Sequence, residues 1–301
     1  MVLLIDVGNS NICFGIYDSD KLLSSYRIKS FLDKSSDEYF LLFKEFVKET
    51  ISDVVISSVV PQITSALVKM SKVYYHIDAK IINQNLKSSL KINVDDPNSV
   101  GADLICDVLG ASLFYKEGII IDLGTASKFL YYKDNTFCGA VIAPGVAIST
   151  KAMIEKGALL PNIELSVPKK VLNTSTIPCM QSGVLFGFAS MVDGLIKKIK
   201  KEIENEDVPL IATGGLITLI APLCNEKINI IEPNLVLYGL ICAYKNKSKD
   251  WIPCFYFYTE IITGKIIGSL SYSFLINVET FSLHNILNSL KSTRPGFWTK
   301  L

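Results

Sequence analysis

The stretch LLIDVGNSN at residues 3–11 recurs as IIIDLGTAS at residues 119–127. Each copy has three apolar residues, an aspartate, an apolar residue, a glycine and then small, mostly polar residues. A strand that ends in Asp-x-Gly places a carboxylate at the edge of a sheet, and the glycine lets the backbone turn tightly. One such turn is usually an ordinary loop, but two copies in matching contexts favour an internal duplication.

The segments after the two copies also match. Each copy is followed by an apolar segment, a polar turn and a second segment, which is the pattern of a β-hairpin. An amphipathic helix and then a strand that runs into a turn are predicted next in each half. The hairpin turns are at 18–20 and 133–135, the helices at 37–50 and 181–206, and the last strands at 54–61 and 209–215. The matching order predicts a duplicated α/β unit with a cleft between the copies.

The length and the net charge of the chain restrict the classes of protein to which it can belong. The chain has 301 residues, enough for about two domains. Its 30 Lys+Arg and 29 Asp+Glu leave a net charge of +1, so no global field attracts nucleic acid. Only Arg27 and Arg294 are arginines, and we therefore expect an anion site to use lysines or backbone N–H groups.

The cysteines and the apolar runs of the chain indicate which cellular compartment to expect for it. The 7 cysteines are scattered, with no C-x-x-C pair, which is typical of reduced thiols in a cytoplasmic protein. The first apolar run is broken by Asp6, so it predicts a strand rather than a signal peptide. Because no uncharged apolar run reaches the roughly 18 to 20 residues that span a bilayer, we expect no membrane partner.

Both acidic turns have the chemistry of a phosphate site. Amides and short polar side chains follow each turn, at Asn9, Ser10 and Asn11 and at 125–127, where they can face phosphate oxygens. Asp6 and Asp122 suit Mg²⁺, which proteins usually hold through one or two carboxylates and the substrate's phosphates.

A third glycine turn, Thr213-Gly214-Gly215, is predicted to open a helix and to admit a nucleotide close to the backbone, although such a pair alone is a weak signal. The chain has neither G-x-x-x-x-G-K-[ST] nor a strand followed by G-x-G-x-x-G, which argues against a Walker-type NTPase and a dinucleotide fold.

With these turns in place, the sequence resembles the type III pantothenate kinases of the actin-like, sugar-kinase and Hsp70 superfamily. The resemblance covers about residues 1–245. Its motifs, in order, are DVGNSN at 6–11, DDPNSVGAD at 95–103, DLGTA at 122–126, IAPG at 142–145, MQSG at 180–183, ATGG at 212–215 and GL at 239–240. Seven ordered matches argue against chance.

The resemblance implies an α/β fold of two duplicated actin-like, ribonuclease H-like domains with a nucleotide cleft between them. We expect the N-terminal domain at 1–115, the C-terminal domain at 116–247 and an extension of unknown structure at 248–301. The extension carries both tryptophans and strand-like runs. An added hairpin that covers an edge, an aggregation-prone tail and a docking element all remain open for it.

The activity implied is ATP-dependent phosphorylation of pantothenate to 4′-phosphopantothenate, the first step of coenzyme A biosynthesis. Asp103 matches the family's catalytic base, whereas its spacing alone would favour a cap for the helix that follows. The implied ATP and phosphate-binding residues are Asp6, Gly8, Asn9, Ser10, Asn11, Gly124, Thr125, Ala126, Gly214 and Gly215.

The resemblance also implies the substrate contacts and the cofactors. The pantothenate-binding residues are Val100, Gly101, Ala102 and Asp103, together with Thr176 from the partner of a homodimer. Mg²⁺ bound with ATP is expected at Asp6 and Asp122. A monovalent cation, K⁺ or NH₄⁺, is implied as well, without ligands that the sequence assigns.

The chain departs from the family pattern near these motifs. Leu104 replaces the arginine of G-A-D-R, and losing such a charge-assisted contact costs roughly 1.5 to 3 kcal/mol unless a nearby lysine compensates. Lys128 stands where the family usually has a threonine; of the two options, a phosphate contact or exposure to solvent, we expect solvent. Ala140 and Val236 replace a glycine and a threonine.

These departures keep two further hypotheses open. The family also contains members described as accessory factors for transcription, so one alternative is a non-catalytic protein that binds nucleotide or a protein partner. The other is a kinase with a changed acceptor, because the lost arginine belongs to the acceptor pocket rather than to the phosphate site.

Overall fold

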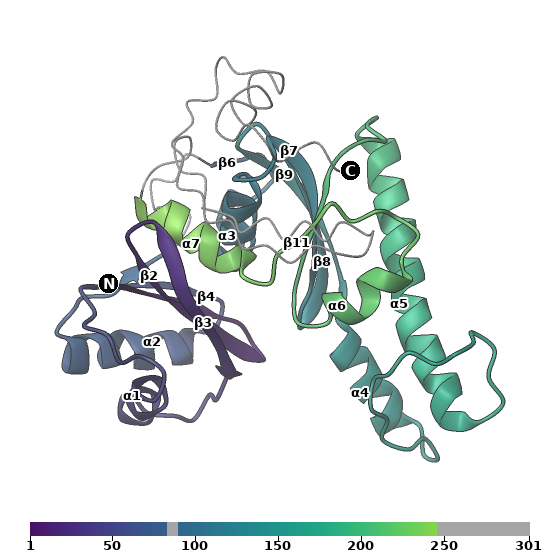
Figure 1. The fold of residues 1–301 in the computed structure, drawn as a ribbon, viewed down its shortest axis with the longest axis horizontal. Coiled ribbons are helices and arrows are strands. Elements are labelled where there is room, and N and C mark those ends of the chain that lie inside the picture. Colours follow the sequence, from purple (N-terminus) through teal and green to yellow (C-terminus); the bar gives the residue numbers. More distant parts are fainter. Residues whose placement is uncertain (83–89, 246–301) are drawn as a thin grey trace, which may run out of the picture. The chain divides into compact units, whose positions relative to one another are not determined.

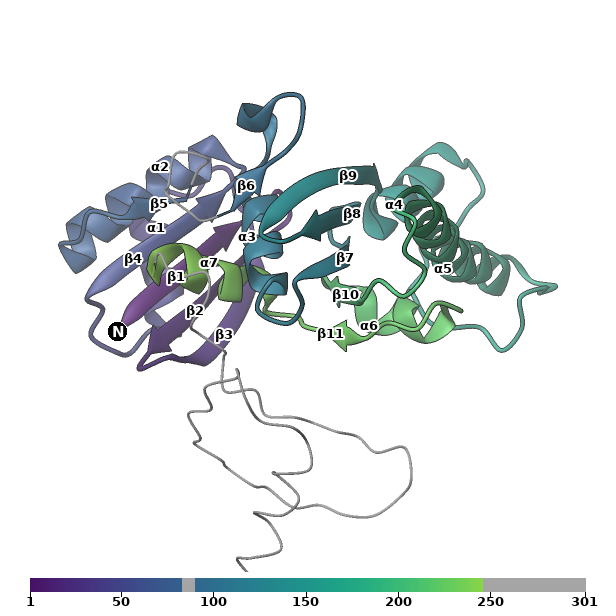
Figure 2. The ribbon, with the colours of Figure 1, turned by 90° about the horizontal axis from the view of Figure 1, so that it is seen from above.

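The computed structural model describes residues 1–82 and 90–245 (Figures 1 and 2). Contacts divide the chain into two units, Met1–Pro253 and Cys254–Leu301, and every described residue belongs to the first. The expectations for the extension at 248–301 therefore lie outside the described residues.

The first sheet has five strands in the order β3-β2-β1-β4-β5. β1 is antiparallel to β2 and parallel to β4, so a hairpin and a crossover strand flank it on its two sides. The turn predicted at 18–20 joins β2 to β3, with Ser19 and Asp20 at positive φ. The strands are β1 (Val2–Val7), β2 (Asn11–Asp18), β3 (Lys21–Lys29), β4 (Asp53–Ser58) and β5 (Lys80–Ile81).

The second sheet repeats this arrangement, with six strands in the order β11-β10-β7-β8-β9-β6. β7 is antiparallel to β8 and parallel to β10, as β1 is to β2 and β4. The strands are β6 (Lys91–Ile92), β7 (Glu117–Leu123), β8 (Ala126–Lys133), β9 (Thr136–Pro144), β10 (Leu210–Thr213) and β11 (Ile230–Ile231). The predicted duplicated α/β fold is confirmed. β6, from before residue 115, nevertheless pairs with β9 of the second sheet.

The helices follow the predicted order with shifted ends. The α-helices are α1 (Ser36–Lys44), α2 (Pro61–Met70), α3 (Ala102–Ala111), α4 (Val146–Lys156), α5 (Thr176–Glu202), α6 (Ile217–Ile220) and α7 (Leu235–Lys245). Shorter turns are η1 (Ser71–Tyr75), a π-helix, and the 3₁₀ helices η2 (Pro97–Ser99) and η3 (Ala221–Leu223).

The predicted bounds of two helices were wrong. The helix expected at 37–50 ends at Lys44. Beyond it, Val47 and Ile51 are buried although their backbone is irregular, so their apolar pattern does not require a helix. A capping box between Ser35 and Glu38 fixes its start. The helix expected at 181–206 begins five residues earlier, at Thr176, since Pro178 falls in the first turn, where a missing N–H costs nothing.

The central strands are buried on both faces, so alternate residues enter different cores. Leu3, Ile5 and Val7 of β1 pack in a cluster with α1 and α2, whereas Val2 and Leu4 pack in a second cluster that contains α3, α7 and residues of both sheets. In β7, Ile119, Ile121 and Leu123 join a third cluster with α5 and α6, while Ile120 joins the shared second cluster. The same alternation assigns Asp6 and Asp122 to the strand faces that line the shared cluster.

Length and composition alone would allow α5 to cross a membrane. Its buried side chains include Leu185, Val192 and Ile196, which pack in the third cluster against the second sheet. One face of α5 therefore packs against the second sheet, as in an amphipathic helix.

Helices α3 and α7 lie side by side in both views (Figures 1 and 2) because glycines allow their backbones to touch. A Cβ at Gly239 would lie 1.8 Å from the Cys106 carbonyl oxygen, and one at Gly110 would lie 2.3 Å from the Leu235 carbonyl oxygen. Both obstacles are backbone atoms, which cannot rotate away. The α3–α7 contact therefore depends on these two glycines.

We predict that Gly239→Ala lowers the free energy of unfolding by about 2 kcal/mol or more, because the helices must separate to admit the methyl group. Gly194→Ala in α5 is the control, since nothing lies within 4 Å of its Cβ position. There the gain in helix propensity should leave stability unchanged or raise it by up to about 1 kcal/mol. Urea denaturation measures both, and equal stabilities of the two variants would contradict the close contact.

Candidate active site

The two acidic turns meet in the structure. Asp6 and Asp122 lie one residue before the ends of β1 and β7. In the turns that follow, the Gly8 N–H donates to the Asn11 carbonyl at 3.0 Å and the Gly124 N–H donates to the Ala126 carbonyl at 3.1 Å. The Thr125 hydroxyl of the second turn donates to Ser10 Oγ of the first at 2.8 Å. The phosphate-type segments from the two repeats are therefore in direct contact.

The third glycine turn packs on the second acidic turn. Gly214 has φ of +97°, which favours glycine, and a Cβ there would lie 2.6 Å from backbone atoms of Leu123. The predicted helix follows as α6, a single turn from Ile217 to Ile220. All three glycine turns of the sequence analysis thus belong to one region.

Arg27 on β3 also reaches this region. Its Nη1 lies 2.6 Å from the position a Cβ would take on Gly215. Among residues 1–82 and 90–245, Arg27 forms no salt bridge with a carboxylate. A guanidinium without an acidic partner beside a glycine turn is suited to an anion. The sequence predicted lysines or backbone N–H groups for an anion site, and Arg27 was not selected because it lies outside the quoted motifs.

Asp103 does not cap α3, which rules out the alternative that its spacing alone favoured. Gly101 occupies the cap position without a side-chain hydrogen bond, and Asp103 lies in the first helical turn. Its carboxylate instead accepts a hydrogen bond from Lys128 Nζ at 2.9 Å. A Cβ on Gly101 would approach Asp103 Oδ1 to 2.5 Å, so glycine at 101 leaves room for this orientation.

The expectation that Lys128 faces solvent was also wrong. Its side chain is only 14% exposed, and its Nζ lies 2.6 Å from Asp122 Oδ2 as well as 2.9 Å from Asp103 Oδ2. The cause is the register of the sheet: Lys128 on β8 is paired directly with Asp122 on β7, so the two side chains share a face. One ammonium group therefore joins the second acidic turn to the first turn of α3.

Burial and mutual repulsion dominate the electrostatics of the acidic groups. Burial raises the pKa of Asp6 to about 7, opposed by a hydrogen bond that Ser57 Oγ donates at 2.9 Å. Burial also raises the pKa of Asp107 on α3 well above its usual range, and the charge of Asp122 adds to the shift. Burial by itself lowers the pKa of Lys128, but the carboxylates of Asp122, Asp107 and Asp103 raise that pKa overall.

The acidic side chains of the site suit a divalent cation that completes its shell with other ligands. Among the described residues, no group of three or more His, Cys, Asp or Glu side chains forms a metal site by itself. Mg²⁺ in kinases usually takes one or two carboxylates and completes its shell with water and phosphates, so such a group is not required. Asp6, with one described hydrogen-bond donor and an excess of negative neighbours, fits a ligand of this kind.

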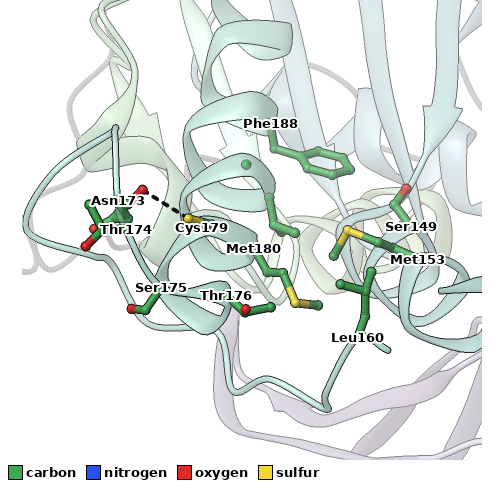
Figure 3. Close-up of a pocket in the computed structure, with 12 residues that line it drawn as sticks. Ser149, Met153, Leu160, Asn173, Thr174, Ser175, Thr176, Cys179, Met180 and Phe188 are labelled. Carbon is green, nitrogen blue, oxygen red and sulfur yellow. Dashed lines mark hydrogen bonds between the residues drawn. The ribbon is translucent and has the colours of Figure 1, made fainter. Parts of the chain in front are cut away.

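The predicted substrate residues divide into two places. Val100, Gly101, Ala102 and Asp103 are consecutive and lead from η2 into α3, beside the ion pair with Lys128. Leu104 is half-buried and packs against the shared apolar cluster. Thr176 is elsewhere: it begins α5 and lines a cavity of about 760 Å³ with Met153, Leu160 and Met180 (Figure 3). None of the residues around that cavity belongs to the glycine turns.

A duplicated α/β fold with an acidic glycine turn in each half, the two turns being in contact, is typical of the actin-like class, which includes ATP-dependent phosphotransferases. The structure is similar to that of a Campylobacter jejuni protein assigned to the Baf family of transcriptional activators, with a TM-score of 0.52 and 19% identity, covering 81% of this chain and 97% of that one. At this identity the likeness supports the fold alone.

The particular family follows from sequence comparisons. The family model described as type III pantothenate kinase matches residues 2–198. The type III pantothenate kinase of Citrifermentans bemidjiense is 38% identical over 258 residues, which cover 82% of this chain and 100% of the relative. That of Halalkalibacterium halodurans is 39% identical over 253 residues, covering 81% and 99%. The chain belongs to the type III pantothenate kinase family, and the prediction made from its motifs is confirmed.

We predict that Asp107→Asn stabilises the metal-free protein more at pH 8 than at pH 5. The pKa of Asp107 is raised in the folded state, so above about pH 4 the folded protein holds a proton that the unfolded chain has lost. Stability therefore falls as pH rises, and the amide removes this contribution. Urea denaturation in EDTA at both pH values measures it. Part of the fall should persist, because the raised pKa of Asp6 acts with the same sign. A variant that is less stable than wild type at pH 8 would contradict the assignment.

Proposed function

We propose that this chain catalyses the ATP-dependent phosphorylation of pantothenate to 4′-phosphopantothenate, the first step of coenzyme A biosynthesis. The observation that carries the proposal is the position of Asp103. Its carboxylate and that of Asp122, at the second phosphate turn, both contact the ammonium of Lys128, at 2.9 and 2.6 Å. Only the ammonium group of Lys128 therefore lies between the Asp103 carboxylate and the carboxylate at the proposed phosphate site.

ATP binds at the three glycine turns in this proposal. Backbone N–H groups and short polar side chains of the turns donate to phosphate oxygens, as in other anion-binding loops. The contact between Thr125 and Ser10 supports a shared site, because it joins the turns from both repeats. The residues proposed for ATP and phosphate are Asp6, Gly8, Asn9, Ser10, Asn11, Gly124, Thr125, Ala126, Gly214 and Gly215.

Mg²⁺ would be held by Asp6 and Asp122 together with the phosphates of ATP. When bound, it neutralises charge on the phosphates during transfer. The burial that raises the pKa of Asp6 supports this role, since an isolated buried carboxylate is unfavourable and a cation relieves it. The family resemblance also suggests a monovalent cation, K⁺ or NH₄⁺, for which we assign no ligands.

Asp103 acts as the general base. It orients the primary hydroxyl of pantothenate and accepts its proton while the hydroxyl oxygen attacks the γ-phosphorus of ATP. The Asp103 carboxylate is about a quarter exposed, so an acceptor can reach it, and its contact with Lys128 restricts its rotation. Val100, Gly101 and Ala102, the residues just before it, would form the adjoining part of the pantothenate site.

The acceptor pocket extends across a homodimer in this proposal, and the partner contributes Thr176. The cavity that Thr176 lines is mainly apolar, and Ile148, Leu159 and Leu172, each next in sequence to a lining residue, are 49%, 94% and 89% exposed. Such an apolar surface favours a subunit interface. The six cysteines in the described part of the chain are free, which is consistent with a reducing cytoplasm.

A kinase with a changed acceptor is the second candidate. Leu104 packs on the apolar cluster and supplies no charge where the resemblance places an arginine. A carboxylate on the acceptor therefore lacks one charged partner. The accessory-protein hypothesis was motivated by Leu104, Lys128 and the extension at 248–301. Lys128 contacts two carboxylates of the site, and the extension lies outside the described residues.

We predict that Asp103→Asn lowers turnover by about 10²-fold or more while nucleotide binding persists, because the amide keeps the shape and loses the base. ADP release with pantothenate, Mg²⁺ and K⁺ measures turnover, and calorimetry measures binding. Asp78→Asn, which removes an exposed carboxylate paired with Lys72, is the control. Near-normal turnover of Asp103→Asn would refute the base. Faster ADP release by wild type with another alcohol than with pantothenate would favour the second candidate.

A mixing experiment tests the shared acceptor pocket. We expect Asp103→Asn and Thr176→Ala homodimers each to be impaired. After the subunits exchange, a hybrid dimer has one site with both residues intact. Random mixing therefore restores about a quarter of the wild-type activity per site. A mixture no more active than the average of its parents would show that Thr176 acts within its own subunit or not at all.

A further inference from the structure

We propose that Lys128 is a catalytic residue of this kinase: its ammonium donates a hydrogen bond to the phosphoryl group in transit between ATP and the acceptor hydroxyl. The inference rests on the proposed function, because it takes the glycine turns as the ATP site and Asp103 as the base. It assigns a chemical role to a residue that departs from the family motif.

The first support is the number of donors. An ammonium has three N–H groups and no acceptor. Asp122 and Asp103 account for two of them, at 2.6 and 2.9 Å. Within the described ranges, the third has no protein acceptor. The Lys128 side chain is largely buried but keeps 14% of its surface exposed, and the proposal assigns the third donor to an oxygen of the ligand.

The second support is the location of the ammonium. Asp122 directly precedes the turn formed by Leu123, Gly124 and Thr125, and Asp103 lies in the first turn of α3. Lys128 Nζ contacts both carboxylates. A phosphoryl group that leaves ATP at the glycine turns for a hydroxyl held at Asp103 must cross this same interval, where the ammonium is already positioned.

The third support is the fixed position of the cation. The carboxylates of Asp122 and Asp103 hold the Lys128 ammonium from two sides, at 2.6 and 2.9 Å. Electrostatic stabilisation by a fixed cation is strongest where water is excluded and where the cation needs no rearrangement. Two carboxylate contacts supply this rigidity.

The chemical step balances with Lys128 as an ammonium throughout. The bond between the acceptor oxygen and the γ-phosphorus forms, and the bond from that phosphorus to the β,γ-bridging oxygen breaks. The hydroxyl proton moves to Asp103, and ADP carries away the bridging oxygen. Lys128 transfers no proton; its third N–H interacts with a non-bridging oxygen, whose charge it stabilises most strongly during transfer.

The same strand provides a matched control. Lys133 on β8 is paired in register with Glu117 on β7, just as Lys128 is with Asp122, and its Nζ lies 3.1 Å from the Glu117 carboxylate. The Lys133 side chain is 53% exposed and lies at the far end of the ladder from the acidic turn. An exposed pair of this kind contributes little stability and lies outside the site.

The experiment compares Lys128→Met with Lys133→Met, both checked for folding by circular dichroism. We expect Lys128→Met to lower kcat about 100-fold or more, as for loss of one donor to a charged transition state. Its affinity for a non-hydrolysable ATP analogue should fall about 10-fold, and its affinity for ADP less than about threefold, since ADP lacks the γ-phosphoryl group. Lys133→Met should match wild type in all three.

Chemical rescue supplies a second, independent measurement. Lys128→Ala leaves space for a small cation, so added ethylammonium should restore turnover at least about 10-fold over the unrescued variant. Lys133→Ala should not respond. If Lys128→Met does not fold, Lys128→Arg keeps the charge and provides the binding comparison. Its fork geometry should lower kcat about 10-fold, while affinity for the ATP analogue stays within about threefold of wild type.

Two results would overturn the proposal: unchanged kcat in a folded Lys128→Met protein, or equal losses of affinity for ADP and for the ATP analogue. A low kcat with unchanged analogue binding and no rescue would also overturn it, since Lys128 would then act only through Asp103. The measurements of affinity for ADP and for the ATP analogue need no acceptor. If wild type fails to phosphorylate pantothenate, the proposed function fails, but these two measurements still test whether Lys128 contacts the γ-phosphoryl group.

Discussion

The bridge from Asp122 through Lys128 to Asp103 is the interaction on which the site depends. Asp6, Asp103, Asp107 and Asp122 repel one another in a region that burial makes costly for charge. Lys128 is the single basic side chain that contacts this set in the described part of the chain. Removing one partner from a buried ion pair usually costs more than the pair contributes. The arrangement therefore ties the loop after β7 to the start of α3, two elements that have no backbone pairing with each other.

Strand alternation explains why the acids gather at all. β1 and β7 are buried on both faces, so a slip of one residue would exchange two apolar cores and is strongly disfavoured. That register fixes Asp6 and Asp122 on the faces directed at the cluster shared by the sheets. The positions of the acids are thus a consequence of core packing. Hydrogen bonds and one ammonium group, rather than exposure to water, offset the unfavourable free energy of placing these carboxylates close together.

Much of the fold and part of the candidate site could be predicted, because short-range sequence patterns specify them. The repeated Asp-x-Gly turns, the hairpins and the order of elements specify the fold, and the motif DDPNSVGAD at 95–103 identifies the region of Asp103. Lys128 was predictable too: the tight turn after Asp122-Leu123-Gly124 pairs residue 128 with 122 on the preceding strand, and applying that register would have corrected the solvent assignment. Arg27 was not, since its approach to Gly215 depends on tertiary packing between segments far apart in sequence. The end of α1 was missed because Val47 and Ile51 are buried without being helical.

Leu104 and Lys128 together change how the site is charged. The family pattern places a cation directly after Asp103 on the helix, whereas this chain has an apolar residue there and a cation on β8 that contacts the same carboxylate. The two positions are not equivalent. A side chain at 104 begins on α3, the helix that carries the proposed base. A side chain at 128 begins on β8, beside the second acidic turn, and contacts the same carboxylate from another element. In the proposed mechanism this moves the charge from recognition of the acceptor to the path of the phosphoryl group, so selectivity for the acceptor would come from shape and neutral hydrogen bonds.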